Sequence, residues 1–202
     1  MEFSNILKGQ ITQSLLKTLM ERVGYRVTRL GVEELFGEIK YLSLERYMAL
    51  GLPLNLRYLP DLLVADPDML KVWLVEVKFR REFNEQAIDS LYRDLKKQRE
   101  HWPNSYAVIM IGKPFVEGGR FHQDCLRVLW PALTERLNRS GEGGKKIYRA
   151  PSGIDVTIER SCEDIWTSLP TLNLTFQQFE RVSDGFASAD LVTSTIKDLS
   201  KL

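Results

Sequence analysis

Cysteine and histidine are scarce in this 202-residue sequence, which contains two of each. Cys125 and Cys162 are not spaced as metal ligands, and neither are His101 and His122. So few cysteines also give no indication of a fold built on disulfides. We therefore expect the chain to work in a reducing compartment, the cytoplasm, without a Cys/His metal site.

Long apolar runs and an excess of charge are also missing. No stretch of about 18 apolar residues occurs, and the first residues lack the basic segment, apolar stretch and cleavage site of a signal peptide. The formal net charge is +1, with 44% hydrophobic and 27% charged residues, as in an ordinary soluble globular protein. We expect no membrane span, while a neutral total still allows a local basic surface.

Apolar periodicity predicts an alternation of helices and strands. Spacings of three and four residues predict helices at residues 5–23, 33–50, 84–101 and 121–137, the last with a kink at Pro131. Shorter alternating or continuous apolar runs predict strands at residues 25–30, 56–65, 71–79 and 105–112. Ser43 and Asn84 are expected helix N-caps. The order helix, strand, inserted helix, two paired strands, helix, strand predicts an α/β fold with a mixed central sheet flanked by helices.

A glycine-rich stretch, residues 140–146, separates this part from the rest. It lacks the spacing of a phosphate-binding P-loop and is typical of a flexible boundary. A hairpin at residues 146–149 and 154–159 is predicted next, followed by helical stretches near Glu163, Phe176 and Leu191. We expect one domain at residues 1–139 and a mostly helical extension at residues 147–202, which packs on that domain or contacts a second copy or a target.

Three charged side chains fall within the two paired strands. If Asp61 faces Glu76 across an antiparallel ladder, the midpoint of the pairing lies between Asp68 and Met69, at the turn that the Asp-Pro-Asp sequence predicts. Lys78 shares a face with Glu76 because strand side chains alternate. Two carboxylates bind a hard divalent cation, and a nearby ammonium stabilises charge on a phosphoryl group. The sequence thus predicts a site suited to phosphodiester hydrolysis.

Part of this pattern is common by chance. Three acid-x-Lys triplets occur, at Glu38, Glu76 and Asp94, and Pro-Asp occurs twice. Asp94 lies on a predicted helix, where residues two apart do not share a face, and Asp68 is explained by the turn. The set of Asp61, Glu76 and Lys78 has both strand context and cross-strand register. A structural ion pair at a sheet edge is the alternative.

Pro60-Asp61, fourteen intervening residues and then Glu76-Val77-Lys78 resemble the motif of the PD-(D/E)xK nuclease superfamily, which has the restriction-endonuclease-like fold. The resemblance covers about residues 5–112, whose element order is similar to that family's core of helix, three strands, helix and strand. The entry from helix to strand at residues 15–27 is also similar to the opening of archaeal Holliday-junction resolvases. The motif itself is short.

The resemblance implies roles for individual residues. Asp61 and Glu76, helped by the backbone carbonyl of Val77, would bind Mg²⁺ or Mn²⁺, and Lys78 would position the attacking water. The family often adds a glutamate from the first helix, and Gln13 stands at that position here. Gln10 is another candidate on that helix, and Glu33 or Glu34 are possible substitutes. This departure puts full activity in question.

Basic residues follow the motif, namely Arg80 and Arg81, and then Arg93, Lys96, Lys97 and Arg99, which we expect on the exposed face of the next predicted helix. We expect Arg80, Arg81, Lys96 and Lys97 to contact nucleic-acid phosphates, although a solvated, salt-bridged helix face is the alternative. The sequence therefore predicts a metal-dependent nuclease acting on DNA, branched or duplex, as a homodimer. The alternative is a catalytically inactive nuclease-like module that binds nucleic acid or a protein partner.

Overall fold

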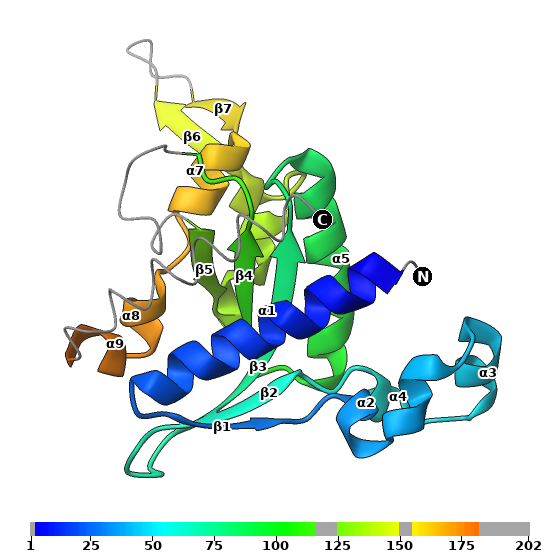
Figure 1. Cartoon of the computed structure of the whole chain (residues 1–202). Helices are drawn as coiled ribbons and strands as arrows, with labels where there is room; N and C mark the ends of the chain where they lie inside the picture. The colour runs from blue at the N-terminus through cyan, green and yellow to red at the C-terminus, as the bar shows by residue number, and fades with distance from the viewer. Residues whose placement is uncertain (1–2, 116–124, 150–154, 182–202) are drawn as a thin grey trace.

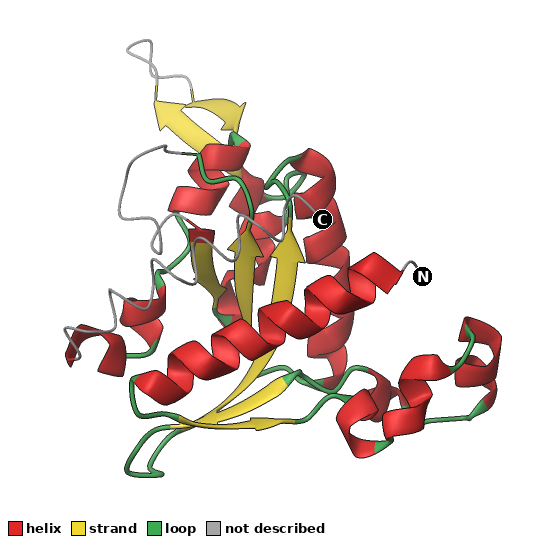
Figure 2. Cartoon of the chain, viewed as in Figure 1, coloured by secondary structure: helices red, strands yellow, loops and turns green. Residues whose placement is uncertain are grey.

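The computed structural model of the chain describes residues 3–115, 125–149 and 155–181. At its centre is a five-stranded sheet in the order β1-β2-β3-β4-β5, in which β3 and β4 are parallel and the other neighbours are antiparallel. The strands are β1 (Arg26–Arg29), β2 (Leu62–Ala65), β3 (Val72–Arg80), β4 (Tyr106–Ile111) and β5 (Leu126–Leu129). Helices lie against the sheet (Figure 2), so the predicted mixed α/β architecture is confirmed.

Two long helices cover opposite faces of the sheet. α1 (Phe3–Arg22) crosses one face (Figure 1) and packs Leu16 and Met20 among the side chains that β3 and β4 direct to that side. α5 (Glu85–His101) packs Ile88, Leu91 and Leu95 against the other face of β4. Both sheet faces are therefore buried, which is the main favourable term in the stability of such a fold.

The ends of these two helices were predictable. Asn84 caps α5 by accepting a hydrogen bond of 2.9 Å from the Ala87 N–H, as expected. Gly24 follows α1 with φ 95°, a conformation that favours glycine, and its N–H donates to the Glu21 carbonyl. Among the described residues, no helix is long and apolar enough to cross a bilayer.

The predicted helix at residues 33–50 is wrong in its continuity. This segment forms α2 (Val32–Leu35), a 3₁₀ helix η1 (Gly37–Tyr41) and α3 (Leu44–Ala49), and α4 (Leu54–Arg57) occupies the start of the strand predicted at residue 56. Ser43 does cap α3 as expected, through a hydrogen bond from the Arg46 N–H. The apolar side chains of α3 and α4 lie on the surface, Leu44 being 72% and Leu54 55% exposed. Their periodicity therefore did not indicate a buried helix face.

The helix predicted at residues 121–137 is also wrong where it is described, from Cys125 onward. Residues of β5 are buried and pair with β4, so a tertiary contact overrides the helical spacing. Pro131 then begins the 3₁₀ helix η2 (Pro131–Leu137). Residues 121–124 lie outside the described part of the chain.

The predicted hairpin of the C-terminal part is confirmed as β6 (Lys145–Arg149) and β7 (Asp155–Glu159), preceded by η3 (Glu142–Gly144). Three short helices follow, α7 (Cys162–Thr167), α8 (Leu172–Thr175) and α9 (Gln178–Arg181). Trp166 is buried on the α5 side of the sheet, and Phe176 on the α1 side makes edge contacts with Tyr25 and Trp73. The helical stretch predicted near Leu191 lies outside the described residues.

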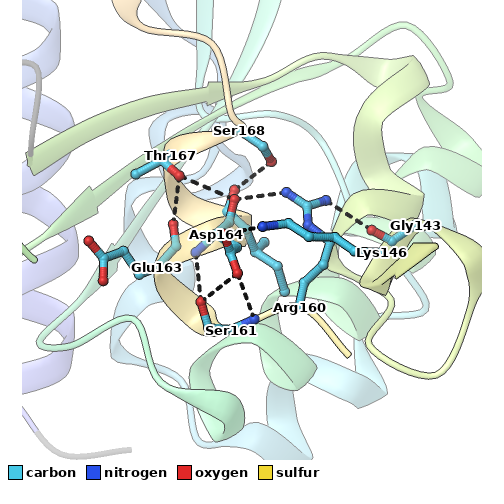
Figure 3. A network of polar contacts seen from close by, with 9 residues as sticks. Gly143, Lys146, Arg160, Ser161, Glu163, Asp164, Thr167 and Ser168 are labelled. Carbon is cyan, nitrogen blue, oxygen red and sulfur yellow. Dashed lines mark hydrogen bonds and ion pairs between the residues drawn. The ribbon is translucent and has the colours of Figure 1, made fainter. Parts of the chain in front are cut away.

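Asp164 joins α7 to the hairpin (Figure 3). Its carboxylate forms an ion pair with Lys146 of β6 and accepts a hydrogen bond of 2.9 Å from the Ser161 hydroxyl. It also accepts a hydrogen bond of 3.3 Å from the Ser161 backbone N–H, as part of a capping box. The Arg160 guanidinium donates to the backbone carbonyls of Asp164 and Gly143 at 2.8 and 3.0 Å. The contacts of its carboxylate lower the pKa of Asp164 to about 2, through Lys146 first and Ser161 second.

Candidate active site

The β2–β3 hairpin sets the position of the predicted carboxylate pair. Its ladder pairs Leu62 with Val75 and Ala65 with Val72, and extending the register by one residue places Asp61 opposite Glu76. The turn lies at residues 66–71, where the Asp66 side chain accepts a hydrogen bond of 2.9 Å from the Lys71 N–H and Met69 has φ 58°. The register predicted from the sequence is therefore confirmed.

β3 continues beyond the end of β2 and is paired there with β4 alone (Figure 1). Asp61, which directly precedes β2, lies beside the part of β3 that β2 does not pair with. Its Oδ2 accepts a hydrogen bond of 2.7 Å from the Val77 N–H. Because the N–H and C=O of one strand residue point to the same edge, the Val77 carbonyl faces this side too. The main chain of Asp61 is fixed in turn, since its carbonyl accepts a hydrogen bond of 2.8 Å from the Leu30 N–H.

Gln13 of α1 contacts the same carboxylate. Its Nε2 donates a hydrogen bond of 2.8 Å to Asp61 Oδ1, so the helix residue expected in place of a glutamate does lie at the site. Gln10 is exposed, and the carboxylate of Glu34 forms an ion pair of 3.1 Å with Arg29. The side chain of Glu33 lies outside the described part of the structure, and among the candidates that are described, Gln13 is the one that contacts Asp61.

Glu76 is 7% exposed and is held by two partners. Its Oε1 lies 2.5 Å from Lys78 Nζ, and its Oε2 accepts a hydrogen bond from Gln98 Nε2 on α5. The sequence reasoning missed Gln98, although a signal was present. Gln98 lies seven residues after Leu91 and three after Leu95, so it continues the buried stripe of α5 as a polar residue.

The charge of Lys78 depends on two opposing effects. Burial by itself lowers the pKa of the ammonium, but the charges of Glu76 and Asp61 offset that effect and raise the pKa above its ordinary value of 10.5. Lys78 is therefore a cation at neutral pH. Because Glu76 would otherwise be a buried, unpaired charge, the two side chains stabilise one another.

The donor set is compatible with a hard cation. Mg²⁺ binds through one or two carboxylates and retains several waters, and a carboxylate that accepts one hydrogen bond per oxygen still has lone pairs available. Asp61 and Glu76 supply such oxygens, with the Val77 carbonyl at the same edge. Among the described residues, however, no group of three His, Cys, Asp or Glu side chains is gathered that could hold a metal. Among the described residues, the side chain beside Asp61 that could supply a third ligand is the Gln13 amide.

The carboxylates open onto a surface hollow of about 530 Å³. It is lined by residues of α1, of the segment before β2 and of β3, namely Lys8, Gly9, Gln13, Asp61, Glu76, Val77, Lys78, Phe79, Arg80 and Arg81. The site is thus open to a large substrate.

The four residues that we predicted to contact phosphates lie in different surroundings. Arg80 and Arg81 line the hollow, but Arg80 pairs with Asp94 at 3.5 Å. Lys97 points into a neighbouring hollow, whereas Lys96 donates to the Tyr92 hydroxyl at 3.4 Å and lines neither hollow.

Arg99 does not lie on the exposed helix face where we expected it. Its guanidinium donates to the carbonyls of Ser105, Leu129 and Pro131 at 3.1 to 3.3 Å. Burial lowers its pKa to about 10. Arg99 therefore joins α5 to β5 and η2.

Comparisons with known proteins add little to this geometry. No protein-family model matches the sequence, and no curated protein matches it. Among solved structures, the chain is similar to Hjc, a Holliday junction resolvase from the archaeal hyperthermophile Archaeoglobus fulgidus, with 12% sequence identity and a TM-score of 0.37 over 83% of this chain and 97% of that chain.

Proposed function

We propose that this chain is a metal-dependent nuclease of the PD-(D/E)xK type, with a restriction-endonuclease-like core, that hydrolyses phosphodiester bonds in DNA. The observation that supports this most directly is the meeting of Asp61, Glu76 and Lys78 in one open hollow. Burying charges is costly unless they are paired or have a chemical role. Here the Asp61 carboxylate lies in the same hollow as the ion pair of Glu76 and Lys78, which is already complete. A purely structural ion pair would not require this second carboxylate.

Asp61, Glu76 and the Val77 carbonyl would hold Mg²⁺ or Mn²⁺, with the Gln13 amide beside Asp61. A bound cation of this kind polarises a phosphoryl oxygen and lowers the pKa of bound water. The hydrogen bonds from Val77 and Gln13 orient the Asp61 carboxylate, and the hydrogen bond from Gln98 orients Glu76. Preorganised ligands of this kind lose little conformational freedom when a metal binds.

Lys78 would act as a cation in this site. A general base must be substantially deprotonated near the working pH, and the raised pKa of Lys78 opposes that role. An ammonium at this position instead orients a water molecule and stabilises negative charge that develops on the phosphoryl group. The base would then have to be another group, such as hydroxide or a substrate oxygen.

An inactive nucleic-acid-binding module is the second candidate. It is favoured by Gln13, since an amide stands where the family often has a glutamate, and by hydrogen bonds that already occupy both oxygens of Asp61 and of Glu76. The two proposals differ in whether the hollow cuts what it binds. An enzyme that cuts both strands of duplex DNA needs two active sites, so we propose that the chain acts as a homodimer. We also propose that it acts in the cytoplasm.

The test is cleavage of branched, duplex and single-stranded DNA with Mg²⁺ or Mn²⁺. The wild type is compared with Asp61→Ala and Lys78→Ala, and with Lys71→Ala as a matched control, because Lys71 is exposed at the opposite end of the same hairpin. We expect the wild type and the control to cut and the two site variants to lose at least about 100-fold in rate. Equal cutting by all four proteins would show that the site lies elsewhere, and binding without cutting would favour the inactive module.

A further inference from the structure

A second hollow is lined in part by the Glu76–Lys78 ion pair. It has a volume of about 290 Å³ and is lined by Arg57, Tyr58, Leu59, Glu76, Lys78, Asp94, Lys97 and Gln98. Glu76 and Lys78 line both this hollow and the larger one that contains Asp61. The candidate catalytic pair is therefore a wall shared by the two hollows.

Each hollow carries two basic side chains that form no ion pair with a described carboxylate. Lys8 and Arg81 line the larger hollow, and Arg57 and Lys97 line the smaller one. Within the described part of the chain, none of the four forms an ion pair with a carboxylate within 4.0 Å. By contrast, the central cations Lys78 and Arg80 are paired with Glu76 and Asp94. Uncompensated positive charge thus flanks a compensated centre on both sides.

Arg57 is held in place with donors to spare. Its guanidinium donates to the carbonyls of Leu52 and Met48 at 2.9 and 3.2 Å and to the Met48 sulfur at 3.1 Å. A guanidinium has five N–H donors, so these three bonds leave two for a ligand. An arginine that is fixed by carbonyls, and not by a carboxylate, keeps its charge available for an anion such as phosphate.

The segment that carries Arg57 is attached to the end of α5, near Lys97. The Trp102 indole donates a hydrogen bond of 2.9 Å to the Asn55 carbonyl, and the rings of Tyr58 and His101 stack with centroids 5.1 Å apart. α4 projects from the body with α2 and α3 (Figure 1). These contacts make the insertion between β1 and β2 one wall of the smaller hollow.

We propose that a DNA strand crosses the Glu76–Lys78 pair from one hollow to the other, with Lys8 and Arg81 binding phosphates on one side of the cleaved bond and Arg57 and Lys97 on the other. The proposal rests on the nuclease function above and gives the inserted helices a role in holding the substrate. It also narrows the set of expected contacts on α5. Lys97 lies on the path, and its neighbour Lys96, which is directed to Tyr92, does not.

The experiment measures DNA binding by the full chain without divalent metal, so that no cleavage occurs. Fluorescence anisotropy of a labelled single strand and of the same sequence as a duplex gives the Kd between about 50 and 200 mM salt, and the slope of log Kd against log salt counts phosphate contacts. We expect Arg57→Ala, Lys97→Ala, Lys8→Ala and Arg81→Ala each to lower the slope by about 0.7 to 0.9. Lys96→Ala is the matched comparison, since it removes the same charge from the adjacent position.

The outcomes separate this proposal from the nuclease proposal. If Lys97→Ala and Lys96→Ala have the same slope, or if the wild type binds neither DNA, the path is wrong, whatever the cleavage assay shows. If the slopes change as expected but the wild type cuts nothing with Mg²⁺ or Mn²⁺, the path stands and the nuclease proposal fails. Arg57→Ala also removes the bonds to Leu52 and Met48, so Lys97→Ala and Arg81→Ala decide the matter if that variant misfolds.

Discussion

Gln98 of α5 donates a hydrogen bond from Nε2 to Oε2 of Glu76 on β3, and its own amide oxygen is buried without a hydrogen-bond partner among the described residues. An unmade hydrogen bond of this kind costs free energy. The hydrogen bond from Gln98 to Glu76 is therefore made although the amide oxygen of Gln98 is left without a partner among the described residues. Such a contact orients a carboxylate more than it stabilises the fold.

Gln98→Ala should weaken metal binding and cleavage together. Without the amide, Glu76 is held by Lys78 alone and can turn toward it, away from a cation. Loss of an outer partner of a metal ligand typically costs about 10- to 100-fold in affinity or activity. We expect the Mg²⁺ concentration for half-maximal cleavage to rise by such a factor, as measured by initial rates over a Mg²⁺ titration.

Gln86→Ala is the control, because Gln86 is exposed on the same helix. Its Mg²⁺ dependence should match the wild type. A Gln98→Ala protein that is folded, cleaves slowly and yet has the wild-type Mg²⁺ dependence would show that Gln98 supports only the packing of α5.

Asp61→Asn should abolish cleavage while leaving the fold intact. Asparagine has the same shape, its oxygen can accept the Val77 hydrogen bond, and the Gln13 amide can rotate to accept from the new NH₂ group. What is lost is the negative charge that a divalent cation requires. We expect the rate to fall by at least about 100-fold with a melting temperature close to that of the wild type.

The wild-type melting temperature should also rise with Mg²⁺ or Mn²⁺, because a ligand of the folded state stabilises it, and that rise should be absent in Asp61→Asn. An equal metal-induced rise in both proteins would mean that the cation binds elsewhere. Calorimetric scans with and without metal measure this independently of any DNA substrate.

The sequence could predict the carboxylate pair because its position depends on local rules. A turn of fixed length and the twofold alternation of strand side chains are enough to place Asp61 opposite Glu76. The same holds for the caps at Ser43 and Asn84. The buried stripe of α5 could indicate that Gln98 is buried, but contacts between distant elements could not be predicted. No local pattern identifies Glu76 as the partner of Gln98 or places Arg57 in the same hollow as Lys97.

The errors of prediction have related causes. Leu126 to Leu129 pair with β4, a strand that precedes them in the sequence. Their strand conformation therefore depends on β4 and not on the spacing of their own apolar residues. The exposed apolar residues of the insertion, such as Leu44 and Leu54, imitate the periodicity of a buried helix. Hydrophobic spacing describes what a segment can bury, and the rest of the fold decides whether it does.

Lys78 should stabilise the fold over a wide pH range and lose that effect only in strong alkali. Its pKa is raised in the folded state, so its contribution is complete below the unfolded pKa of about 10.5 and declines as the pH rises through the higher folded value. Lys78→Met removes the charge but keeps most of the apolar stem.

We expect the difference in unfolding free energy between the wild type and Lys78→Met to be constant from pH 7 to about 10 and to shrink above it. Urea denaturation at each pH measures the difference, in which the titration of other groups largely cancels. A difference that already shrinks between pH 7 and 9 would indicate a lowered pKa, and Lys78 would again be a candidate general base.

Asp164 should make the attachment of the β6–β7 hairpin sensitive to acid. Its pKa is lowered to about 2, by Lys146 first and then by the Ser161 hydrogen bonds, so its contribution to stability is complete above the ordinary value of 3.8 and is lost as the pH falls toward 2. Asp164→Asn keeps a hydrogen bond to Ser161 but loses the ion pair. The wild type should therefore be more stable than Asp164→Asn at pH 6, and the two should converge between pH 4 and about 2.

Glu163→Gln is the control, because its exposed carboxylate has no ion pair with a described residue, and its difference from the wild type should be small at every pH. Hydrogen exchange of the β6 and β7 amides measures the effect locally, and equal protection in Asp164→Asn and the wild type at pH 6 would contradict the assignment of Asp164 as the residue that joins α7 to the hairpin.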